Sequence, residues 1–127
     1  MSIVSVVIAF LILGIVVIVH EFGHFILAKL NGIVVEEFSV GMGPRLLSTD
    51  RGGTVYSLRA IPFGGSCMMK GEDEEDTAEG SFNSKSVWRR MSVIFAGPFF
   101  NFILAFFGAL VIISAVGYDP PRITAVE

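Results

Sequence analysis

The chain has 127 residues, enough for one domain, and 53% of them are hydrophobic before its 14 glycines are counted. Soluble domains reach only about 45–50% on a count that includes glycine, so the composition excludes a disordered chain and a typical soluble enzyme. One cysteine is too few for a disulfide-stapled secreted domain, and a net charge of −3 offers no basic surface, so no nucleic-acid partner is expected. The lipid bilayer is the expected surrounding for much of the chain.

The first predicted element is a transmembrane helix within residues 1–29. Residues 3–19 are almost entirely apolar, and the first charged side chain is Glu21. A helix of this length is about 40 Å long, more than the ~30 Å of a hydrocarbon core. A cleaved signal peptide fits less well, because no Lys or Arg precedes the apolar run and no small-residue cleavage site follows it.

This helix is predicted to carry a metal site. It contains His20-Glu21-Phe22-Gly23-His24, and these are the two histidines of the chain. Residues i and i+4 share one face of a helix, so both imidazoles could bind one metal ion. Glu21 is rotated around the helix from His20, where it could accept a proton from water acidified by Zn²⁺. Because polar groups are costly inside a membrane, this H-E-x-x-H pattern predicts His20 and His24 as zinc ligands and Glu21 as the catalytic base.

Residues 30–87 are predicted to form a loop that contains a β-hairpin. Three extended segments are expected, with a glycine-rich turn at residues 50–53 between the last two: residues 34–40, 46–47 and 54–60. The sequence Ile61-Pro62-Phe63-Gly64-Gly65 is expected to end the last strand and turn the chain.

The second transmembrane helix is predicted within residues 88–118. Its apolar part contains Gly97-Pro98, which membrane helices tolerate, and Asn101, whose amide needs a partner in lipid. Eight of the nine Lys and Arg residues lie between the two spans. The positive-inside rule therefore places the loop in the cytoplasm, and His20, about 26 Å along the first helix, lies nearer that side.

Together these segments resemble the N-terminal part of the site-2 protease family of intramembrane zinc metalloproteases. The resemblance rests on HEFGH at 20–24 and on four further segments, the last of which matches the GPxxN motif of the family: residues 37–44, 54–65, 82–90 and 96–102. It implies a mainly α membrane protein, with two transmembrane helices joined by a cytoplasmic loop that carries a membrane-associated β-hairpin. It also implies a multi-pass protein of the bacterial cell membrane and single-span membrane substrates such as anti-sigma factors or remnant signal peptides. Asn101 would bind substrate, with helix–helix contact as its alternative role.

The resemblance also indicates parts that lie outside these 127 residues. A catalytic zinc ion takes three protein ligands, and the family supplies the third, an aspartate, from a later membrane helix. Cys67 is a weaker candidate for that ligand. Residues 119–127 resemble the first strand of a PDZ domain. We therefore expect the C-terminal part of the protease as a partner, and we expect the chain alone to bind zinc weakly and to cleave no peptide.

Three alternatives stay open at this point. A membrane-bound zinc peptidase of another family would share HExxH, although such enzymes usually lack GPxxN. A non-catalytic membrane scaffold would keep the fold, although it would have little reason to retain Glu21. The hairpin is expected either to bind substrate by strand addition or to form an amphipathic cap over the site.

Overall fold

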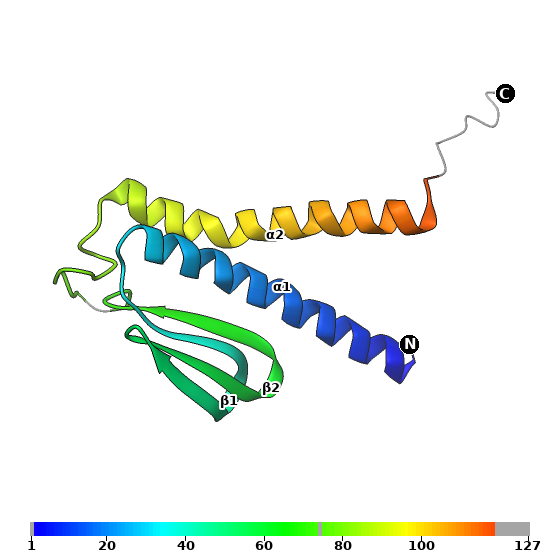
Figure 1. Ribbon diagram of the computed structural model, residues 1–127, viewed down its shortest axis with the longest axis horizontal. Helices are drawn as coiled ribbons and strands as arrows, with labels where there is room; N and C mark the ends of the chain where they lie inside the picture. The colour runs from blue at the N-terminus through cyan, green and yellow to red at the C-terminus, as the bar shows by residue number, and fades with distance from the viewer. Residues whose placement is uncertain (1, 74, 119–127) are drawn as a thin grey trace.

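The computed structural model describes residues 2–73 and 75–118 (Figure 1). Its elements follow the order α1 (Ile3–Leu30), β1 (Val35–Arg51), β2 (Thr54–Met69) and α2 (Val87–Val116). The two helices approach each other near the end of α1 and diverge from there, and the hairpin lies against α1 on the side away from α2 (Figure 1). The predicted PDZ strand at residues 119–127 lies outside the described residues.

Both helices are long and apolar enough to cross a membrane. The hydroxyl of Ser2 accepts a hydrogen bond from the backbone N–H of Ser5 and so caps the start of α1. At the other end of the chain α2 passes through Pro98 and ends at Val116, two residues before the predicted end at Tyr118. The reason is Gly117, whose φ of 83° and ψ of 175° form a non-helical backbone conformation that is essentially restricted to glycine.

The hairpin is longer than predicted. The expectation that residues 61–65 end the second strand is wrong, because residues 61–69 pair with residues 35–42 and β2 continues to Met69. Residues 37–40 pair with 65–68 on one side and with 55–58 on the other, so the two long strands curl back on themselves. Gly41 permits this bend, since its φ is 86° and a methyl group there would lie 2.5 Å from the carbonyl oxygen of Ile61.

A small core joins the hairpin to both helices. It consists of buried side chains from the end of α1, the turn after it, the two strands, the loop after β2 and the start of α2: Ala28, Ile33, Val35, Met69, Phe82 and Val93. Polar contacts reinforce it, because Lys29 Nζ donates to Thr54 Oγ1 at 2.8 Å and Thr54 donates to the carbonyl of Val35 at 2.7 Å. These contacts fix the hairpin to the C-terminal end of α1, and Phe63 of β2 also packs against Phe10 nearer the start of the helix, with ring centroids 5.5 Å apart.

Glu37 is buried in the hairpin, and its negative charge is paired there with two arginines. Its carboxylate pairs with Arg45 at 2.5 Å and with Arg59 at 2.9 Å, and it accepts a hydrogen bond from Ser57. Burial alone would raise the pKa of Glu37, but the hydrogen bonds from Ser57, Arg59 and Arg45 outweigh burial and lower the pKa. The ionised carboxylate thus stabilises the curled sheet.

Replacing this carboxylate tests that conclusion. Glu37→Gln is expected to destabilise the hairpin by about 1–3 kcal/mol, because two arginines lose a charged acceptor. Protection of the hairpin amides from hydrogen exchange in detergent measures the loss. Glu36→Gln, at the exposed neighbouring position, is the matched control and is expected to change stability by less than about 0.5 kcal/mol.

The same measurement has a defined pH dependence. Because the pKa of Glu37 is lowered in the folded state, its contribution is complete above the unfolded pKa and is lost as pH falls through the folded value. Amide protection is therefore expected to fall below about pH 4 in the wild type and to fall less in Glu37→Gln. Equal pH dependence in the two proteins would contradict the assignment.

Candidate metal centre

His20 and His24 lie one turn apart on α1 and face α2. Their ring centroids are 4.8 Å apart, with 81° between the ring planes. A methyl group on Gly97 of α2 would lie 2.5 Å from Nε2 of His24 and 2.7 Å from Nε2 of His20. Both nitrogens therefore face the same small space, which exists because residue 97 has no side chain.

The close approach of the helices creates this arrangement. A methyl group on Gly23 would lie 2.5 Å from the carbonyl oxygen of Ala96, so the second glycine of the contact is also required. Gly23, Ala96 and Gly97 are all buried. Small residues let helix backbones approach closely, as they do in membrane helix pairs.

The other ring nitrogens of the two histidines have partners on α2. Nδ1 of His24 lies 2.7 Å from the carbonyl oxygen of Val93. A carbonyl only accepts, so Nδ1 of His24 carries the proton and its Nε2 keeps a lone pair. Nδ1 of His20 lies 3.2 Å from Nδ2 of Asn101. The structure thus brings the predicted residue Asn101 beside the histidine pair.

Glu21 faces the hairpin. A methyl group on Gly65 of β2 would lie 3.7 Å from Cγ of Glu21. The histidines point toward α2 and Glu21 toward β2, as the rotation of one residue along a helix dictates. The carboxylate therefore lies between the histidine-bearing helix and the strand that passes it.

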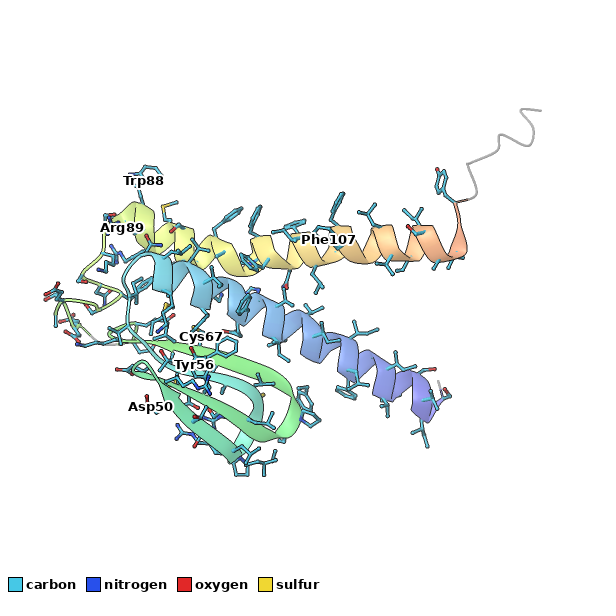
Figure 2. The ribbon with its side chains drawn as sticks, viewed as in Figure 1. Asp50, Tyr56, Cys67, Trp88, Arg89 and Phe107 are labelled. Carbon is cyan, nitrogen blue, oxygen red and sulfur yellow. The ribbon has the colours of Figure 1, made fainter. Side chains whose placement is uncertain are left out.

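The described residues bring together two side chains, those of His20 and His24, of a kind that can bind a metal ion. Within residues 2–73 and 75–118, no group of three His, Cys, Asp or Glu side chains could hold a metal ion. Cys67 lies on β2, on the hairpin side of α1 (Figure 2). Burial, with a smaller effect from the negative charge of Glu21, raises the pKa of Cys67 to about 12. The two histidines instead face α2.

These residues fit part of a catalytic zinc site. Two imidazole Nε2 atoms face one space, one ring is fixed by a backbone carbonyl, and a carboxylate follows the first histidine. Zinc sites of peptidases use such nitrogen ligands, with an outer partner on each ring. The third protein ligand is not among the described residues.

Sequence reasoning missed two features of this site. From the sequence, Gly97 is expected only to be tolerated in a membrane helix, whereas in the structure it leaves room beside both imidazoles. Its spacing of four residues from Asn101 is the signal that could have indicated a shared face. The carbonyl of Val93 has no sequence signal, because every residue supplies one.

Comparisons with known proteins show that this chain is similar in sequence to peptidases. Residues 8–125 match the sequence profile of peptidase family M50. A relative from Clostridium acetobutylicum is 49% identical over 105 residues, covering 83% of this chain and 31% of the relative. Relatives from Clostridium perfringens and Fusobacterium nucleatum are 42% and 48% identical, covering 93% and 78% of this chain and 35% and 29% of their own lengths. All three are named provisionally as zinc metalloproteases, and this chain spans about a third of their length.

The space at residue 97 can be filled experimentally. Gly97→Ala is expected to lower zinc affinity about ten-fold or more, because its methyl group would displace both imidazoles. Chelator competition on the purified chain in detergent measures the affinity. Gly108→Ala on the same helix is the control, since a methyl group there meets nothing within 4 Å. Equal zinc affinity in Gly97→Ala and Gly108→Ala would show that the metal does not occupy this space.

Proposed function

The chain belongs to peptidase family M50, and from this premise we propose that it is the N-terminal part of an intramembrane zinc metalloprotease. The resemblance to site-2 proteases is confirmed by this match, which decides against a peptidase of another family. One observation carries the proposal: the Nε2 atoms of His20 and His24 converge beside Gly97, in helices of membrane-spanning length.

The proposed location is the bacterial cell membrane, with the hairpin in the cytoplasm. Large apolar side chains on both helices are exposed, for example Ile12 on α1 at 56% and Phe102 on α2 at 76%, and lipid would cover them. Trp88 is 79% exposed at the start of α2 and points away from α1, next to Arg89 (Figure 2). An aromatic residue beside basic residues is typical of the cytoplasmic membrane interface.

In the proposed reaction the side chains of this chain have separate roles. His20 and His24 would hold Zn²⁺ together with a ligand from the remaining C-terminal part of the protease. Bound Zn²⁺ supplies a Lewis acid that acidifies water and polarises the scissile carbonyl. Glu21 would accept a proton from the attacking water and return it to the leaving amine. With the third ligand supplied elsewhere, the chain alone is proposed to be inactive.

The proposed substrates are single-span membrane proteins, such as anti-sigma factors or remnant signal peptides. A substrate helix must unwind before its backbone reaches a catalytic group, and an unwound segment can add to the edge of a sheet. Among the described residues, 65–69 pair on one side only, with 35–40, and Gly65 lies beside Glu21. Strand addition at this edge would carry the substrate past the base, with Asn101 holding its backbone from the opposite side.

The role of Glu21 is testable in the full-length protease. Glu21→Gln is expected to lower cleavage of a single-span substrate by about 10²–10⁴-fold, because glutamine cannot accept the proton. Zinc content is expected to stay at the wild-type value, since Glu21 is not a ligand. Glu36→Gln is the control and should cleave normally. Unchanged cleavage in Glu21→Gln would overturn the role of Glu21 as the base, and loss of zinc would make Glu21 structural.

The proposed orientation is testable by cysteine labelling in intact cells. In a Cys67→Ala background, Asp50→Cys in the hairpin is expected to react with an impermeant maleimide only after the cells are opened. Ser2→Cys, at the opposite end of α1, is expected to react in intact cells. The reverse pattern would place the hairpin outside and overturn the proposed location.

A further inference from the structure

The amide of Asn101 makes a contact that the proposed reaction does not explain. Its Nδ2 lies 3.2 Å from Nδ1 of His20, across the helix interface. Its Oδ1 is buried and has no hydrogen-bond partner among the described residues. Buried polar side-chain atoms nearly always have a partner, so the orphaned oxygen indicates that the amide has a further role or a different orientation.

The protonation of the His24 ring indicates the form that the His20 ring needs for metal binding. The carbonyl of Val93 accepts from Nδ1 of His24, which leaves the Nε2 lone pair facing Gly97. If Nδ2 of Asn101 donates to Nδ1 of His20, the neutral His20 ring must carry its proton on Nε2. That proton would point into the same space beside Gly97 and would block metal binding there.

A half-turn of the Asn101 amide removes this conflict. Its oxygen and nitrogen are nearly equal in shape, and their assignment follows from the hydrogen-bond network. Turned, Oδ1 accepts from Nδ1–H of His20, the orphaned oxygen gains a partner, and Nε2 of His20 keeps its lone pair.

We propose that Asn101 is a positioning residue that accepts a hydrogen bond from Nδ1–H of His20 and thereby holds Nε2 unprotonated beside Gly97. The carbonyl of Val93 does the same for His24, so α2 sets the tautomer of both imidazoles. The turned amide places Nδ2 where the buried Oδ1 lies, so the atom left without a partner among the described residues is then a donor. The proposal deepens the proposed function, since it rests on the histidines as the zinc ligands, but the tautomer itself exists without metal.

The experiment reads the tautomer directly. The 127-residue chain is labelled with ¹⁵N-histidine, stripped of metal in detergent and studied by NMR at a pH where both rings are neutral. The ring ¹⁵N shifts show which nitrogen carries the proton, and His24→Ala assigns the two rings. Both rings of the wild type are expected to be protonated at Nδ1. A wild-type His20 protonated at Nε2 would overturn the proposal.

Two substitutions of Asn101 separate the effect of its hydrogen-bond acceptor from the effect of its size and shape. Asn101→Leu removes the acceptor, so His20 is expected to shift toward the Nε2–H form and zinc affinity to fall about 10–100-fold. Asn101→Asp only accepts, so it is expected to keep the Nδ1–H form of His20. A persistent Nδ1–H form in Asn101→Leu, or a shift in Asn101→Asp equal to that in Asn101→Leu, would contradict the proposal.

Controls distinguish this inference from the function on which it rests. His24 is an internal check, because its Nδ1–H signal should persist in every Asn101 variant that keeps the fold. Asn31→Leu removes the other interhelical asparagine, which donates to Ser92, and should leave His20 unchanged. Expected tautomers without zinc binding would count against the metalloprotease alone, whereas zinc binding with His20 protonated at Nε2 before loading would count against the positioning role alone.

Discussion

The close approach of α1 and α2 at Gly23 and Gly97 is the contact on which the rest of the site depends. In lipid no hydrophobic force drives two apolar helices together, so close packing and interhelical hydrogen bonds must hold them. Both occur here in one place. Gly23 and Ala96 let the backbones approach, and Gly97 leaves space that the imidazoles use. The polar contacts of His20, His24 and Asn31 with α2 lie on either side of these small residues.

The hairpin places backbone of β2 beside Glu21. The one buried carboxylate inside the hairpin, all of which the structure describes, is fully paired. Glu37 is buried there, and its two arginines and Ser57 satisfy the carboxylate. Lys29 and Thr54 then fix the sheet to α1. The result is a strand whose Gly65 passes the side chain of Glu21. The helix pair thus fixes the direction of the histidines, and the hairpin fixes the surroundings of the carboxylate.

The sequence predicted the parts of this molecule that follow from local rules. The helix ends differ from prediction by at most two residues, because the length of an apolar run is a local signal. The pairing of the two imidazoles follows from their i, i+4 spacing. The extent of β2 was missed because Pro62 and its neighbouring glycines are typical of turns, whereas pairing with residues 35–42 overrides that tendency. The space at Gly97 and the carbonyl of Val93 depend on how the helices cross, which a single sequence does not encode locally.

The Nδ1 atoms of His20 and His24 both have their partners on α2, and this arrangement has a thermodynamic consequence. Val93 and Asn101 both lie on α2, so a tilt or slide of α2 along α1 changes the environment of both imidazoles together. Metal binding at the proposed site and the interhelical geometry would then be linked, and each would change the free energy of the other by the same amount. A bound cation would stabilise one crossing angle of α1 and α2. Any substrate or partner that favours another crossing angle would, by the same reciprocity, weaken the hold on the metal.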